Sequence, residues 1–79
     1  MKFLYLSTTG ASDPTKASIP LHLAVNGSAE VGHDTVIVLA GDAAEIILGD
    51  NINTIEGVGV PPMRELIEKV KAHEVPVFV

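Results

Sequence analysis

The feature of this chain that most constrains its fold is the alternation of three short apolar runs with helical segments. The runs are residues 2–6 (KFLYL), 35–40 (TVIVLA) and 75–79 (VPVFV). Near-continuous runs of strand-forming residues are typical of a parallel sheet that is covered on both faces. Strands that alternate with helices pair in parallel through right-handed crossovers. We therefore expect one α/β domain over residues 1–79.

The first connecting segment carries a clear helix-start signal. Asp13 followed by Pro14 provides an N-cap carboxylate with proline at the first helical position. Helical spacing then continues over residues 15–31, with Gly32 as the expected C-terminal cap. Pro20 lies inside this segment and is expected to kink the helix, because proline has no N–H group to donate.

Two further helices are expected after the second run. A short one covers residues 43–48 (AAEIIL) and ends at Gly49, and Pro61-Pro62 introduce the last one. The apolar residues of the last helix fall at i, i+3, i+4 and i+7, which predicts one buried stripe. These residues are Met63, Leu66, Ile67 and Val70. In the first helix, Gly27 is expected to pack closely against the sheet.

Three strands and two long helices suggest the spatial strand order 2-1-3, with the helices on opposite faces. We therefore expect a three-layer domain with a short parallel sheet, of the flavodoxin-like or Rossmann-like type. Ligands of such sheets bind beyond the carboxyl ends of the strands, where the strand order reverses. The sequence therefore predicts a weak ligand site in the loops after the first two strands. Its candidate residues are Ser7, Thr8, Thr9, Gly10, Gly41 and Asp42.

The loop at residues 7–14 (STTGASDP) has two interpretations. Its hydroxyl side chains and the following helix N-terminus could cradle a small anion or a nucleotide phosphate. It lacks both the GxxxxGK[ST] spacing of a P-loop and the GxGxxG spacing of a dinucleotide site. An ordinary strand-to-helix loop with an Asp13 cap also explains it, and Asp42 is equally well read as a helix cap.

Composition excludes several classes of chemistry. The chain has no cysteine, which removes thiol nucleophiles, persulfide carriers and Cys-ligated zinc or iron–sulfur clusters. His22, His33 and His73 match no zinc spacing and are expected at surface or cap positions. We therefore expect no catalytic residue, no metal site and no cofactor. A net charge of -5 without a basic stripe argues against nucleic acid as a partner.

No apolar run approaches the ~18 residues of a membrane-spanning helix. The N-terminus also lacks the apolar region of a signal peptide, so a cytoplasmic protein is expected. The connection at residues 47–60 (ILGDNINTIEGVGV) is unusually apolar. It could pack on the core, or it could be exposed and form a contact between subunits.

Three segments in this order resemble the DsrE/DsrF-like family, which includes the YchN-like proteins. They are DPTKA at residues 13–17, AEVGHDTVIVLAGDAAEI at 29–46 and GVGVPPMRELIEKVKAHEVPVFV at 57–79. The resemblance implies a flavodoxin-like fold, homo-oligomers that are often trimers or hexamers, and sulfur transfer through a cysteine persulfide. In such proteins the reactive cysteine follows the strand matching VPVFV, which places it beyond Val79. We therefore expect that the sequence lacks the C-terminal part of the family fold.

The sequence departs from the family pattern in two places. It has no cysteine to carry sulfur, and its last helix lacks the usual terminal glycine, so that His73 or Glu74 must make the turn. By resemblance, the expected function is a sulfur-relay or sulfur-related redox subunit whose reactive cysteine lies outside this sequence. The alternatives are a structural or regulatory subunit of a homo- or hetero-oligomer, and a small-anion or nucleotide-binding module.

Overall fold

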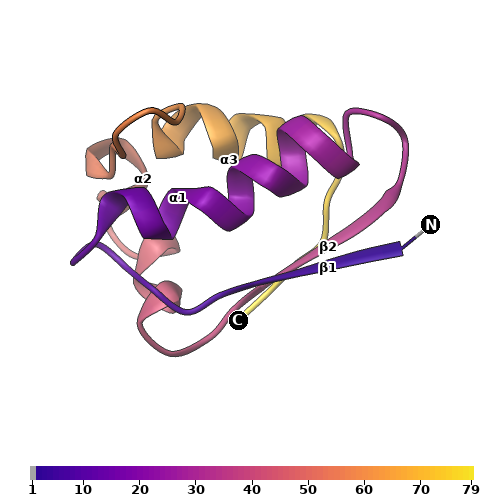
Figure 1. Ribbon diagram of the computed structural model, residues 1–79. Helices are drawn as coiled ribbons and strands as arrows, with labels where there is room; N and C mark the ends of the chain where they lie inside the picture. Colours follow the sequence, from indigo (N-terminus) through magenta and orange to yellow (C-terminus); the bar gives the residue numbers. More distant parts are fainter. Residues whose placement is uncertain (1) are drawn as a thin grey trace.

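The computed structural model describes residues 2–79 and has two layers (Figure 1). One layer is a parallel sheet of β1 (Lys2–Ser7), β2 (Asp34–Leu39) and β3 (Val77–Phe78). The other layer holds the main helices, α1 (Pro14–Leu23) and α3 (Met63–Ala72). The predicted α/β architecture with a short parallel sheet is therefore confirmed.

Three shorter helices are also present within residues 2–79. Their bounds are Ala24–Ser28 for a π-helix that continues α1, Gly41–Ile47 for a 3₁₀-helix after β2, and Asn51–Thr54 for α2. Among residues 2–79, no helix has the length and apolar character needed to cross a membrane.

The predicted strand order 2-1-3 is wrong, because the sheet has the order β1-β2-β3. The central strand is β2, which pairs with β1 along its whole length and with β3 near its middle. The Ile37 N–H donates to Pro76 O over 2.9 Å, and the Ala40 N–H extends the other ladder to Ser7 O, also over 2.9 Å. With this order the sheet has no point at which the direction of winding reverses.

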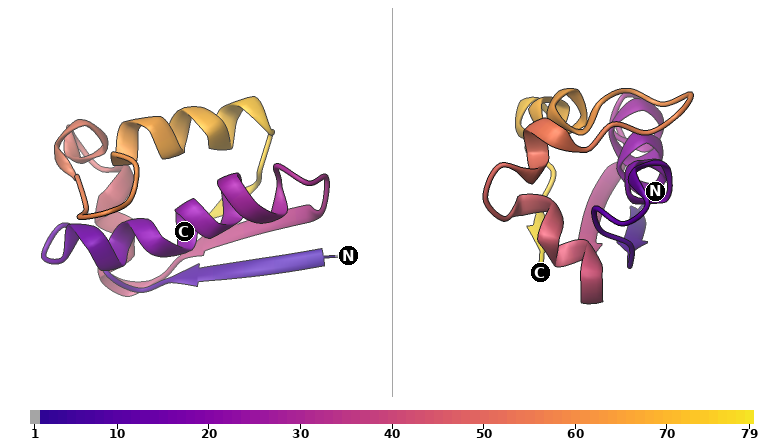
Figure 2. Two further views of the ribbon diagram at one scale, coloured as in Figure 1. Left: turned by 45° about the horizontal axis from the view of Figure 1, so that its top comes forward. Right: turned by 90° about the vertical axis from the view of Figure 1, so that its left-hand side faces the viewer.

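The predicted three-layer arrangement is also wrong. Two right-handed crossovers that step in the same direction across a sheet place both connecting helices on the same face. The two views of Figure 2 agree that α1 and α3 lie side by side on one face of the sheet. The opposite face carries no helix within residues 2–79. We call it the open sheet face.

The first helix begins where the sequence predicts and changes its winding after the proline that is expected to disturb it. The Lys16 N–H donates to Asp13 Oδ1 (3.1 Å), which makes Asp13 the N-cap. Pro20 is accommodated inside α1, and the π-helix begins four residues later. The prediction for Gly27 is wrong, since nothing lies within 4 Å of the position that its Cβ would take.

The last helix follows its predicted pattern. The four residues of its apolar stripe are all buried. The turn into β3 uses Glu74, whose φ of 54° lies in the left-handed region that glycine prefers. The prediction that His73 or Glu74 must replace the missing glycine is therefore confirmed.

A single core lies between the helices and the covered face of the sheet. Its buried apolar residues are Ala17, Leu21, Ala24, Val25, Ile37, Leu39, Ala43, Ile46, Ile55, Met63, Leu66, Ile67, Val70 and Val75. The apolar connection at residues 47–60 is partly buried in the core and partly exposed. Ile55 is buried in the core, whereas Leu48 and Val58 are exposed.

Candidate functional site

The two loops predicted to form a ligand site do lie together at the carboxyl edge of the sheet. The hydrogen bond between Ala40 and Ser7 ties the end of β2 to the end of β1. Gly10 is buried, and a Cβ built on it would overlap the Asp42 backbone oxygen and the Glu45 carboxylate. Only a glycine permits this approach, so Gly10 has a packing role. The contact closes the space between the two loops.

The carboxyl edge is a poor environment for an anion. The Glu45 carboxylate lies against Gly10, and a second carboxylate, that of Asp13, belongs to the same loop and accepts from the Lys16 N–H (3.1 Å). Asp13 also occupies the N-cap of α1. Thr8, Gly41 and Asp42 are exposed, and Thr9 is half-buried. The predicted residues therefore come together, but two carboxylates beside the loop repel a phosphate.

Ser7 is the one predicted site residue with an unexplained polar group. Its side chain is 1% exposed, and its hydroxyl has no hydrogen-bond partner among residues 2–79. A buried hydroxyl without a partner costs about 1–3 kcal/mol relative to its hydrated state. Ser7 lies on the covered side of β1, beneath the helical layer.

We expect Ser7→Ala to leave the free energy of unfolding unchanged or to raise it by about 1 kcal/mol, because it removes an unpaired buried group. Urea denaturation followed by far-UV circular dichroism measures this. The matched control is Ser28→Ala. Ser28 is also buried, but its hydroxyl is paired with the Tyr5 hydroxyl, so its removal should lower the stability by about 1 kcal/mol. A comparable loss in Ser7→Ala would show that the Ser7 hydroxyl has a partner.

A cavity of about 520 Å³ lies at the opposite, amino edge of the sheet. It lies at the start of β2, beside the turn that connects α3 to β3. Its charged and titratable lining residues are Lys2, His33, Asp34, His73 and Glu74. Apolar side chains, including Phe3 and Val75, line the rest. The volume is within the range of small-molecule sites.

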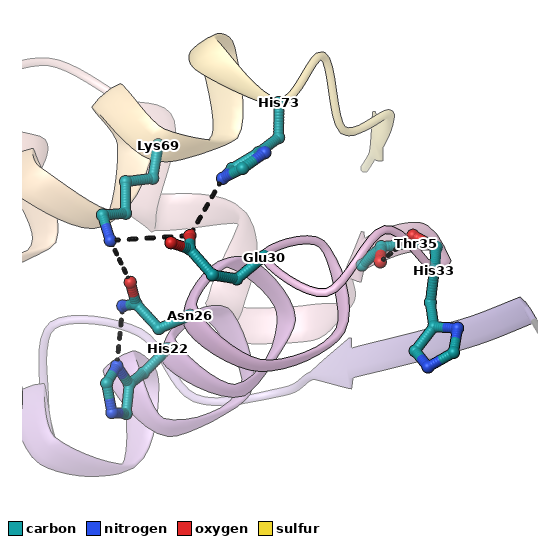
Figure 3. Close-up of polar contacts among 7 residues, drawn as sticks. All are labelled: His22, Asn26, Glu30, His33, Thr35, Lys69 and His73. Carbon is teal, nitrogen blue, oxygen red and sulfur yellow. Dashed lines mark hydrogen bonds and ion pairs between the residues drawn. The ribbon is translucent and has the colours of Figure 1, made fainter.

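Next to this cavity, a chain of polar contacts joins the first helix to α3 (Figure 3). The Asn26 amide donates to His22 Nδ1 (2.9 Å) and receives a hydrogen bond from the Lys69 ammonium. Glu30 lies 3.9 Å from Lys69 Nζ and 3.3 Å from His73 Nε2. The groups are partly exposed, so each contact contributes little on its own. Together they fix α3 against the end of the π-helix.

The histidines at the cavity do not converge on one point. Figure 3 shows His73 directed at Glu30, whereas His33 points away from that cluster. The His33 ring packs against Phe3, with the ring centroids 5.2 Å apart. Within residues 2–79, no three histidine, aspartate or glutamate side chains are placed to hold a metal ion. The cavity therefore presents polar groups along its rim, and the described residues form no metal-binding group of three there.

The open sheet face is the third candidate site. Alternation along β1 and β2 directs Leu4, Leu6, Val36 and Val38 to this face, and Phe78 extends it onto β3. Leu4 is 67%, Leu6 54% and Phe78 59% exposed. The result is one contiguous apolar surface, since Leu4 pairs with Val36 and Leu6 with Val38 in the sheet register.

Comparison with models of known protein families finds no match for this chain. Searches of curated proteins and of solved structures give no significant match either.

Proposed function

We propose that this chain is a non-catalytic subunit of a homo-oligomer and that the open sheet face forms the contact between subunits. The observation that carries this proposal is the uncovered apolar face of a parallel sheet. Parallel sheets occur almost only where both faces are covered, because their strands are apolar on both sides. Here the helices cover one face, and a second copy of the chain supplies the cover for the other.

The free energy gained by burying the apolar side chains of this face favours association. Complete burial of a leucine or phenylalanine side chain contributes about 1.5–3 kcal/mol relative to its exposed state. Leu4, Leu6 and Phe78 are each more than half exposed. A contact that buries Leu4 and Leu6 from both copies therefore offers several kilocalories per mole before the cost of association.

The resemblance to the DsrE/DsrF-like proteins supplies a biochemical context for such a subunit. In that context the chain serves sulfur transfer as a structural or regulatory component, and the persulfide cysteine lies outside residues 1–79. The absence of cysteine from residues 1–79 supports the non-catalytic role. A phosphate or nucleotide ligand has less support, because the carboxylates of Asp13 and Glu45 lie beside the candidate loop.

The test is sedimentation velocity over a range of concentrations. We expect the wild-type chain to associate and Leu4→Glu to remain a monomer, because the substitution would place a carboxylate in an apolar contact. Leu4 is exposed in the single chain, so its replacement should leave the fold intact by circular dichroism. Leu48→Glu is the matched control, since Leu48 is 60% exposed but lies on the connection at residues 47–60.

Two results would contradict the proposal. One is a wild-type chain that stays monomeric at every concentration. The other is dissociation by Leu48→Glu but not by Leu4→Glu, which would place the subunit contact on the connection.

A further inference from the structure

We propose that two copies dock with their open sheet faces together, related by a twofold axis that runs along the strands between β1 and β2. This inference rests on the proposed function and identifies the geometry of its contact. In this arrangement Lys2 of each copy lies over Asp34 of the other. The charged pair selects a second copy of this chain as the partner and sets the direction in which it docks.

The sheet register makes the face complementary to itself. Lys2 pairs with Asp34, and the next pairs on the same face are Leu4 with Val36 and Leu6 with Val38. Rotation about the proposed axis places β1 of one copy over β2 of the other. Each lysine then meets an aspartate, and each leucine meets a valine. This is the self-complementary pattern that a twofold contact requires.

The opposite docking direction is disfavoured by charge. An axis across the strands would place Lys2 and Asp34 over the end of the face that carries Leu6, Val38 and Phe78. Both charges would then lose water to apolar neighbours without gaining a partner, which is costly. Neither Lys2 nor Asp34 takes part in the ion pairs found within residues 2–79, so both are available to a second copy.

The dimensions permit the crossed pairs. Packed sheets lie about 10 Å apart, a gap that lysine and aspartate side chains directed toward each other can bridge. Aligned sheets cross at about 30°, which displaces the strand ends by roughly 4 Å over strands this short. The face itself spans no more than roughly 300 Å², given strands ~4.8 Å apart and ~3.3 Å per residue. Such a contact buries less than the ~1,200 Å² of total surface that standard specific interfaces bury, so the dimer is weak and concentration-dependent.

The same docking changes the cavity at the amino edge. Lys2 and Asp34 line that cavity as well as the open sheet face. Because the axis runs along the strands, the cavities of both copies lie at the same end of the dimer. Each cavity is then bordered by a lysine and an aspartate from the other copy. The cavity is therefore a composite feature of two chains.

Charge reversal and mixing test this geometry. Lys2→Glu places two acidic residues at the crossing, and Asp34→Lys places two basic ones, so each variant alone should dimerise at least tenfold more weakly. An equimolar mixture should recover dimers, because the introduced glutamate of one variant then meets the introduced lysine of the other, while the native Asp34 meets the native Lys2. Native mass spectrometry distinguishes these mixed dimers from homodimers. Lys16→Glu and Glu68→Lys, which change the charge equally on the helical side, should dimerise as the wild type does.

The mixing experiment distinguishes a Lys2–Asp34 ion pair between two copies from one within a single copy. A Lys2–Asp34 pair within a single chain would be lost in both variants and could not be restored by mixing. If Leu4→Glu prevents association but neither charge variant affects it, the proposed axis is wrong while the proposed function stands. If the wild-type chain does not associate, both proposals fail.

Discussion

Gly10→Ala is expected to lower the free energy of unfolding by about 1–3 kcal/mol, the usual cost of forcing an extra methyl into a packed site. The new Cβ would overlap the backbone oxygen of Asp42, and a backbone atom moves only if the loop after β2 moves with it. That loop is tied to β1 by the hydrogen bond from Ala40 to Ser7. The strain therefore passes into the sheet. Urea denaturation monitored by circular dichroism provides the measurement.

Gly27→Ala is the matched control for this change. Nothing lies within 4 Å of the position of its Cβ, and Gly27 is not among the glycines with positive φ. Alanine at such a helical position should stabilise the fold by about 0.4–1 kcal/mol, through the reduced entropy of the unfolded chain. If Gly10→Ala were as stable as the wild type, the two loops could not approach as closely as described.

The second large effect is expected for Ile37→Ala, which should cost about 2–5 kcal/mol. Ile37 is fully buried at the centre of β2, beneath the helices. Domains have about 0.05–0.15 kcal/mol of stability per residue, so a chain of 79 residues has roughly 4–12 kcal/mol in total. The substitution can therefore remove half of the stability. Thermal and urea denaturation both report it.

Val38→Ala, one position along the same strand, isolates the effect of the covered face. Val38 is half-buried and points to the open sheet face, so its truncation should cost well under half as much as that of Ile37 when the protein is dilute enough to be monomeric. Equal losses for the two variants in dilute solution would mean that the open sheet face is covered within the single chain.

Local features of this fold could be predicted from the sequence because short-range chemistry determines them. Asp13 caps α1 through its own carboxylate, and α3 buries the stripe set by its 3.6-residue period. Glu74 adopts the left-handed conformation because the turn after α3 requires it and no glycine is present. In each case the determining groups lie within a few residues of one another.

The strand order could not be predicted in the same way. Both β1 and β2 are apolar on two sides, and this pattern suits a central strand covered on both faces equally well as a strand with one face open. Whether α3 crosses back over β1 or continues past β2 depends on which helices pack together. In the structure α1 and α3 share one core through residues such as Leu21 and Leu66. No local signal in the sequence encodes that choice.

The candidate site could likewise be predicted from the sequence only in part. Proximity of Ser7 and Gly41 follows from any parallel pairing of β1 with β2, so the sequence is enough to predict it. The involvement of His33 and His73 in a cavity was missed, although a signal existed. His33 precedes β2 and His73 lies in the turn that leads to β3, so both must lie at the amino edge of a parallel sheet.

The π-helix at Ala24–Ser28 makes the positions of the side chains after it depend on the exact number of residues in this segment. A wider turn takes up more residues than an α-helical turn, which changes the angular position of every later side chain. This angular position brings the hydroxyl of Ser28 to Tyr5 and the carboxylate of Glu30 to α3. Loss or gain of one residue here would rotate the following side chains by about 100°. An insertion or deletion in this segment is therefore expected to break both contacts, which far-UV and near-UV circular dichroism would report as a loss of stability.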